Sequence, residues 1–127
     1  MQALALAEFR FEPILAPTVL FGRHPGWGAP GGGPVPTEMF ESLLDGIEAN
    51  GGFEQADLVL TGYFTSAAQV RAAARAIDAV RAAPRGAEAR KPLVVVDPTM
   101  GDSGKGLYVQ PEVPAAITAE LIRRADY

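Results

Sequence analysis

Two short apolar runs on either side of a long amphipathic segment constrain the fold more than any other feature of this chain. Residues 58–60 read Leu-Val-Leu, and residues 93–96 read Leu-Val-Val-Val. Uninterrupted runs of this length are typical of strands that are covered on both faces, as in parallel sheets. Between them, Ser66 and Gln69 have the spacing of a capping box, which predicts a helix from there to about Ala83. Strand, helix and strand in this order predict a βαβ unit and an α/β fold.

The segments on both sides extend this alternation. Residues 1–9 read as the end of a helix, and residues 11–21 as an edge or interrupted strand, because its two prolines cannot donate to a central ladder. Residues 24–36 have the composition of a loop, Thr37 is expected to cap a helix that runs to about Asn50, and residues 111–124 form the last helix. The side chains expected to point inward are Met39, Phe40, Leu43, Leu44 and Ile47 in one helix and Val70, Ala73, Ile77 and Val80 in the next.

These elements predict a single partial domain over residues 1–127, with a three-layer α/β/α architecture and a mostly parallel sheet. The architecture is expected to be incomplete at both ends. A strand should precede the first helix, and another strand should begin at residues 125–127.

Composition narrows the classes of function. The 127 residues contain 11 Lys and Arg against 15 Asp and Glu, a formal net charge of −4, and no basic stripe that would indicate nucleic-acid binding. The chain has no cysteine, which excludes a disulfide, a thiolate zinc site and a cysteine nucleophile. Neither a signal-peptide layout nor an apolar run of about twenty residues is found, so we expect a cytoplasmic protein without a membrane partner.

Polar and aromatic clusters follow the three expected strands, at residues 22–28, 61–63 and 97–102. In open parallel sheets ligands bind beyond the carboxyl ends of the strands, so we expect these clusters to converge. Asp97 and Asp102 could hold Mg²⁺ through oxygen ligands, as in phosphoryl-transfer sites. The alternative is an Asp-Pro turn at Asp97 and a solvated loop carboxylate at Asp102.

Other residues of these loops have an equally plain alternative. His24, the sole histidine, could donate a hydrogen bond to a substrate oxygen or be an ordinary loop residue. Trp27 and Tyr63 could stack on an aromatic ligand or simply pack. Residues 101–106, Gly-Asp-Ser-Gly-Lys-Gly, lack the spacing of a phosphate-binding P-loop and indicate either a flexible loop near a nucleotide or a surface turn.

Three motifs in sequence order resemble the pyridoxal kinases of the ribokinase-like superfamily. They are Asp-Leu-Val-Leu-Thr-Gly-Tyr at 57–63, Val-Val-Val-Asp-Pro-Thr-Met-Gly-Asp at 94–102 and Gly-Leu-Tyr-Val at 106–109. Residues 21–28, Phe-Gly-Arg-His-Pro-Gly-Trp-Gly, stand where that family has a substrate loop reading roughly Phe-Ser-Asn-His-Thr-Gly-Tyr-Gly. The resemblance extends from about residue 11 to residue 127.

The resemblance implies ATP-dependent phosphorylation of the 5′-hydroxyl of pyridoxal, pyridoxine or pyridoxamine, with ATP, Mg²⁺ and a monovalent cation as cofactors and a homodimer as a family trait. It implies a substrate-loop role for His24, with Trp27 beside it, and a place for Tyr63 in the wall of the pyridine pocket. Tyr108 is implied to border the active site. The resemblance places Asp97 near the phosphates and the metal, and Asp102 on the ATP side.

Two departures from the family pattern affect what the chain is expected to do alone. Pro25 replaces a threonine, and Gly22-Arg23 replaces Ser-Asn. The family's catalytic aspartate lies in a Gly-Thr-Gly-Asp segment that these 127 residues do not contain, so no catalytic residue is assigned and the chain alone is expected to be inactive. The alternatives are a non-catalytic pyridine-binding or interaction module and a relative of the hydroxymethylpyrimidine kinases, which usually lack an aromatic residue at the position of Tyr63.

Overall fold

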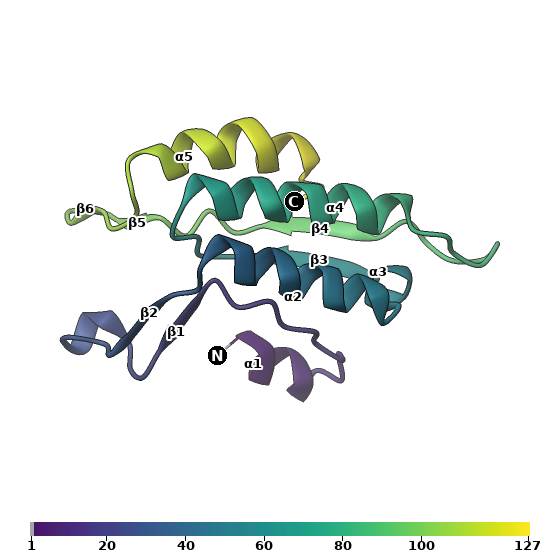
Figure 1. Cartoon of the computed structure of the whole chain (residues 1–127), viewed down its shortest axis with the longest axis horizontal. Helices are drawn as coiled ribbons and strands as arrows, with labels where there is room; N and C mark the ends of the chain where they lie inside the picture. The colour runs from purple at the N-terminus through teal and green to yellow at the C-terminus, as the bar shows by residue number, and fades with distance from the viewer. Residues whose placement is uncertain (1) are drawn as a thin grey trace.

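The computed structural model describes residues 2–127 and is built around one parallel βαβ unit (Figure 1). Strands β3 (Leu58–Thr61) and β4 (Leu93–Val96) pair in parallel, with Leu58 opposite Leu93 and Thr61 opposite Val96. Helix α4 (Ala67–Ala82) connects them. The predicted strand, helix and strand are therefore confirmed.

Four further α-helices flank this unit within the described residues. Helix α2 (Thr37–Ala49) is followed by the short α3 (Gly52–Gln55), and α1 (Gln2–Glu8) lies near the start of the chain, where Met1 is outside the described residues. Helix α5 (Glu112–Ala116) continues as a π-helical turn, Ile117–Leu121, and a 3-10 turn, Ile122–Arg124. Among the described residues, no helix is both long and apolar enough to cross a membrane.

The core lies between the strand pair and the helices. Val94, the most deeply buried strand residue, and Val96 pack with Ile77 of α4 and Leu121 after α5. All four residues of the stripe predicted for α4 lie in buried positions. In α2 only Phe40 of the predicted face is fully buried, and Met39 and Leu43 remain exposed because α4 covers a narrower part of that helix.

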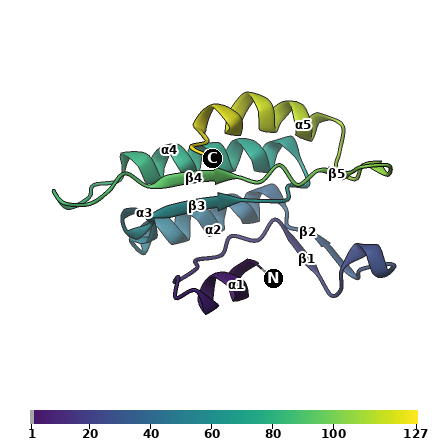
Figure 2. The ribbon, with the colours of Figure 1, turned by 180° about the vertical axis from the view of Figure 1, so that it is seen from behind.

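Only one face of the parallel pair is covered by the described helices. Helices α2 and α4 lie in front of the strands in Figure 1 and behind them in Figure 2. On the other face Leu60 and Leu93 are 36% and 48% exposed. The expectation that these strands are covered on both faces is therefore not met in the part of the chain described, because the second face leaves both leucines partly exposed.

The predicted first strand is much shorter than residues 11–21 and does not join the parallel pair. Strand β1 (Val19–Phe21) forms an antiparallel hairpin with β2 (Gly32–Pro34), inside the segment predicted to be loop. Prolines at 13 and 17 keep the preceding residues out of a ladder. Gly32 permits the pairing, because a Cβ there would lie 2.0 Å from the carbonyl oxygen of Leu20.

The last residues run beside β4. The backbone N–H of Tyr127 donates to the carbonyl of Val94 at 3.2 Å, and the N–H of Val96 donates to the carbonyl of Tyr127 at 3.0 Å. This alternation is the hydrogen-bond pattern of a parallel neighbour. These bonds are consistent with the strand that is expected to begin near residue 125.

Two helix starts differ from the prediction. Pro36, not Thr37, is the N-cap of α2, and no side chain caps that helix. At α4 the hydroxyl of Ser66 accepts from the N–H of Gln69 at 3.2 Å, as a capping box requires, but the Gln69 side chain bonds elsewhere. Its amide oxygen accepts from the N–H of Thr65 at 2.9 Å, so the second half of the box is absent.

Candidate functional site at the carboxyl ends of β3 and β4

The ends of the two parallel strands are tied together. The backbone N–H of Asp97, directly after β4, donates to the carbonyl of Thr61, the last residue of β3, at 3.3 Å. Tyr63 lies two residues after Thr61. Asp97 and Tyr63 are therefore placed at the same edge by the sheet register, as predicted from the rule that strand ends carry the ligand site.

Residues 101–107 fold into a small antiparallel hairpin beyond β4. Strand β5 (Gly101–Asp102) pairs with β6 (Gly106–Leu107), and the N–H of Tyr108 donates to the carbonyl of Met100 at 3.1 Å. No residue with a side chain could replace Gly101 without a shift of the backbone, because a Cβ there would lie 2.7 Å from the carbonyl oxygen of Gly106. The segment is thus a tight turn that holds Asp102 on one arm and brings Tyr108 back toward the strand ends.

Four of the six predicted site residues come together here. The ring centroids of Tyr63 and Tyr108 are 6.1 Å apart, with their planes tilted by 36°. Partial burial raises the pKa of the Tyr108 hydroxyl above its ordinary value, and the negative charges of Asp102 and then Asp97 raise it further. Both carboxylates therefore lie close enough to Tyr108 to act on it electrostatically, and the four side chains form one aromatic and acidic cluster.

The remaining two residues lie at the tip of the β1–β2 hairpin. His24 is the N-cap of a 3-10 turn (η1, Pro25–Trp27), and its Nδ1 accepts from the N–H of Gly26 at 3.1 Å. The rings of His24 and Trp27 are 5.8 Å apart, and Trp27 is 79% exposed. The hairpin tip extends beyond the same end of the β3–β4 pair as β5 and β6 (Figures 1 and 2). The two residues contact one another, and among the described contacts none joins them to Tyr63 or Tyr108.

Asp97 and Asp102 could hold a divalent cation only together with other ligands. Within residues 2–127 no group of three or more His, Asp and Glu side chains could enclose a metal ion. Asp97 and Asp102 are both exposed carboxylates beside Tyr108. Mg²⁺ commonly takes one or two carboxylates and completes its shell with water and substrate phosphates, so this pair fits such a role.

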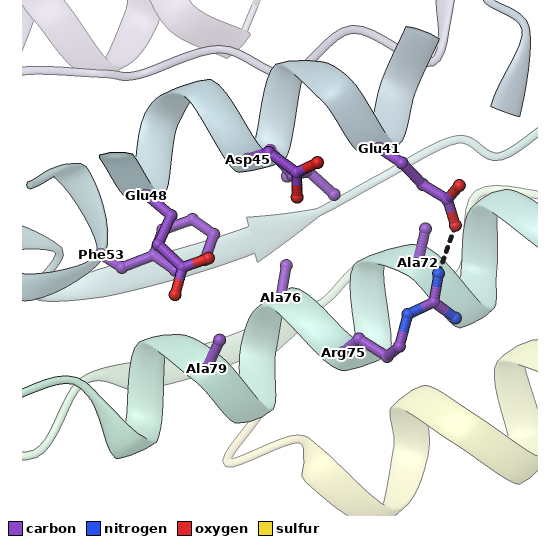
Figure 3. A pocket seen from close by; sticks show the side chains of 9 residues that line it. Glu41, Asp45, Glu48, Phe53, Ala72, Arg75, Ala76 and Ala79 are labelled. Carbon is purple, nitrogen blue, oxygen red and sulfur yellow. Dashed lines mark hydrogen bonds and ion pairs between the residues drawn. The ribbon is translucent and has the colours of Figure 1, made fainter. Parts of the chain in front are cut away.

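A groove of about 270 Å³ between α2 and α4 contains none of the predicted site residues (Figure 3). Phe53 and the small side chains of Ala72, Ala76 and Ala79 line it, and Glu41 on its rim is paired with Arg75. Sequence reasoning did not anticipate the groove, because it exists where alanines of α4 face acidic residues of α2.

No family model matches the chain, but individual proteins are similar to it. The chain is 41% identical to a pyridoxal kinase of Deinococcus radiodurans over 121 residues, which are 95% of this chain and 39% of that protein. It is 34% identical to a pyridoxine/pyridoxal/pyridoxamine kinase of Bordetella avium, covering 97% of this chain and 40% of that protein. Over the part it spans, this chain resembles the pyridoxal kinases.

Solved pyridoxal kinases share the fold as well. That of Entamoeba histolytica superposes with a TM-score of 0.85 at 28% identity, over 98% of this chain and 42% of that one. That of Leishmania donovani, in complex with ADP and pyridoxamine, gives 0.77 at 32% identity, over 86% and 36%. The predicted ribokinase-like α/β fold, in incomplete form, is confirmed. The chain spans about two fifths of the length of the pyridoxal kinases that it matches.

Proposed function

We propose that this chain supplies the substrate-side part of a kinase that phosphorylates the 5′-hydroxyl of pyridoxal, pyridoxine or pyridoxamine with ATP. The observation that carries the proposal is the cluster of Tyr63, Tyr108, Asp97 and Asp102 at the carboxyl ends of β3 and β4. An aromatic wall suits a planar pyridine ring, and adjacent carboxylates suit a metal-bound triphosphate. The kinship with pyridoxal kinases supports the same conclusion.

In the proposed reaction the 5′-oxygen forms a bond to the γ-phosphorus, and the bond from that phosphorus to the β,γ-bridging oxygen breaks with its electron pair staying on ADP, which leaves. The hydroxyl proton is released to a base that is not among these 127 residues and then to solvent. Tyr63 and Tyr108 would orient the ring, so that the 5′-hydroxyl is directed toward the phosphates. Asp97 and Asp102 would hold Mg²⁺, which supplies charge stabilisation for the transferring phosphoryl group when it is bound. A monovalent cation on the phosphate side belongs to the same proposal.

The hairpin tip is assigned to the outer side of the substrate. With Nδ1 of His24 occupied as an acceptor, its Nε2 is the atom that can donate to a ring substituent of the substrate. Trp27 would then cover the ring from the solvent side, because it lies against His24 and is exposed.

The proposal is tested by exchange of this segment into a relative. The 121 matched residues of the Deinococcus radiodurans kinase are replaced by those of this chain, and formation of pyridoxal 5′-phosphate from ATP and pyridoxal is measured. We expect turnover, reduced by Asp97→Asn roughly 10²-fold, a typical cost of removing one electrostatic contact to a transition state. The matched control is Asp57→Asn, at the opposite end of β3, which should leave the rate unchanged. A chimera that melts cooperatively and binds ADP but forms no product would contradict the proposal.

A second candidate is a pyridine-binding module without turnover. It is favoured for the isolated chain by the absence of a Gly-Thr-Gly-Asp segment from the 127 residues. The two candidates differ in a simple measurement on the isolated chain, in which Trp27 emission reports pyridoxal binding and chromatography reports the phosphorylated product. A hydroxymethylpyrimidine kinase relative is the third candidate, and preference for the pyrimidine substrate in the chimera would favour it.

A further inference from the structure

The β1–β2 hairpin is attached to the rest of the molecule at its base. The residues from Leu20 to Gly32 are almost all exposed, whereas Val35 is buried in the core and Thr18 is partly buried. The ladder closes there, with the N–H of Val35 donating to the carbonyl of Thr18 at 2.9 Å. The contacts at this base therefore determine where the tip stands.

One buried side chain joins both arms of that base to helix α4. Gln69 in the first turn of α4 is fully buried. Its Nε2 donates to the carbonyl of Thr18 at 3.1 Å and to the carbonyl of Val35 at 2.8 Å. Its Oε1 accepts from the N–H and the hydroxyl of Thr65 at 2.9 and 2.8 Å.

These four bonds use the whole capacity of a carboxamide. The two Nε2 protons meet two carbonyl oxygens, which can only accept, and Oε1 meets a backbone N–H, which can only donate, so the amide has one orientation. A carboxylate would present oxygen to the two carbonyls, and an apolar side chain would remove the bonds that Gln69 makes to the Val35 carbonyl and to the N–H and hydroxyl of Thr65. Among the proteinogenic side chains of this length, only glutamine satisfies the site.

The same base is connected directly to the site. The hydroxyl of Thr18 donates to the carbonyl of Tyr63 at 2.7 Å, and Thr65, two residues after Tyr63, is held by Gln69. The carbonyl of Tyr63 is thus bonded to the base of the hairpin. The backbone N–H two residues later is bonded to Gln69, which holds the same base. The hairpin that carries His24 and Trp27 and the turn that carries Tyr63 form one hydrogen-bonded unit.

We propose that Gln69 is a positioning residue, which fixes the β1–β2 hairpin against the β3–α4 turn and so sets His24 and Trp27 relative to Tyr63 across the substrate pocket. The proposal rests on the proposed function for its meaning in catalysis. The mechanical part of it, that Gln69 holds the hairpin in place, is independent of any ligand.

The test uses the full chain with Gln69→Glu, which keeps the bonds to Thr65 and removes both bonds to the hairpin. The matched control is Gln55→Glu, the same change at an exposed glutamine of α3. Hydrogen exchange should become about 10-fold faster or more at the hairpin amides, such as that of Val35, because two bonds are lost. Exchange at the β4 amides, such as that of Leu93, should keep its rate, as should all amides of the control.

A second measurement tests whether the position of the hairpin affects the affinity for pyridoxal. Trp27 is the only tryptophan, so its emission reports the tip. Pyridoxal should quench it in the wild-type chain, and Gln69→Glu should weaken the apparent affinity by about 10-fold, the equivalent of losing the two bonds. Lack of any response in the wild type would refute the proposed function and leave the exchange experiment to decide the positioning role.

Two outcomes overturn the inference. One is unchanged exchange at the hairpin in Gln69→Glu, and the other is an equal increase in the hairpin and in β4, which would indicate a general structural role. If Gln69→Glu does not fold, Gln69→Met decides by the same criteria. It keeps the length of the side chain without burying a charge, removes the bonds to Thr18 and Val35, and should accelerate hairpin exchange about 10-fold or more.

Discussion

Adjacent residues of β4 provide a sharp test of a sheet that is covered on one face only. Val94 is fully buried under the helices, whereas Leu93 points to the opposite face and is 48% exposed. We expect Val94→Ala to lower the free energy of unfolding by about 2–3 kcal/mol, since it removes two buried carbons at ~0.8 kcal/mol each and leaves a cavity. Leu93→Ala removes three carbons that are half-exposed and leaves a dent that water fills, so about 1 kcal/mol is expected.

The order of these two costs is the informative quantity. In a strand covered on both faces, Leu93→Ala would be the costlier change, because buried Leu→Ala substitutions cost roughly 3–5 kcal/mol. Urea unfolding followed by far-ultraviolet circular dichroism, at two protein concentrations, measures both variants with the wild-type m-value as a check on two-state behaviour. A cost for Leu93→Ala that equals or exceeds that of Val94→Ala would refute the reasoning, and it would mean that the second face is covered in solution.

Three further predictions follow from single contacts. Asp78, whose pKa is lowered chiefly by its hydrogen bonds to Arg124, should contribute stability above pH 3.8 that is lost as the pH falls below it. Asp78→Asn should therefore lower the melting temperature at neutral pH, by the equivalent of about 0.5 kcal/mol for an exposed pair, and have no effect in strong acid. Asp102→Asn should lower the pKa of Tyr108, measured from the absorbance of tyrosinate, and an unchanged titration would show that the two groups lie far apart. Ser66→Ala should cost about 1 kcal/mol in urea unfolding through loss of the cap on α4, and a cost near zero would mean that the cap contributes nothing.

The sequence predicts the βαβ unit well because the signals for it are local. The apolar stripe of α4 repeats every three or four residues, and a helix of that periodicity buries one face wherever a sheet is available. The run at 93–96 matches β4 residue for residue. Whether the second face of a strand is covered is a long-range property, and the apolarity of Leu60 and Leu93 does not say whether the covering layer lies within the same 127 residues.

The β1–β2 hairpin escaped prediction for a different reason. Its second strand is Gly-Gly-Pro, which has neither the apolar alternation nor the β-propensity of a strand. The pairing depends on the left-handed backbone of Gly32 and on bonds from Gln69, which is 51 residues from Thr18 in the sequence. A side chain assigned to a local cap was in fact bonded across the fold, and no pattern within a short window distinguishes the two.

The candidate site was easier to predict than the hairpin, because the carboxyl ends of parallel strands fix where loop residues meet. Asp97 follows β4 directly and Tyr63 lies two residues after the end of β3, so the strand register brings both to one edge. Tyr108 and Asp102 required the β5–β6 turn, which the spacing of glycines only suggested.

The proposed function also distinguishes what these 127 residues would bind from what they would catalyse. Phosphoryl transfer needs an acceptor pocket, charge to hold the phosphates, and a group that stabilises the transferring oxygen atoms. Under the proposed function the cluster at the strand ends would serve the first two, and His24 would donate from Nε2, because its Nδ1 accepts from the N–H of Gly26. In the resemblance the third group belongs to a Gly-Thr-Gly-Asp segment, which the 127 residues do not contain. Measurements that follow Trp27 therefore test the proposed substrate binding, and measurements that follow the product test the proposed turnover, so the two address different parts of the proposal.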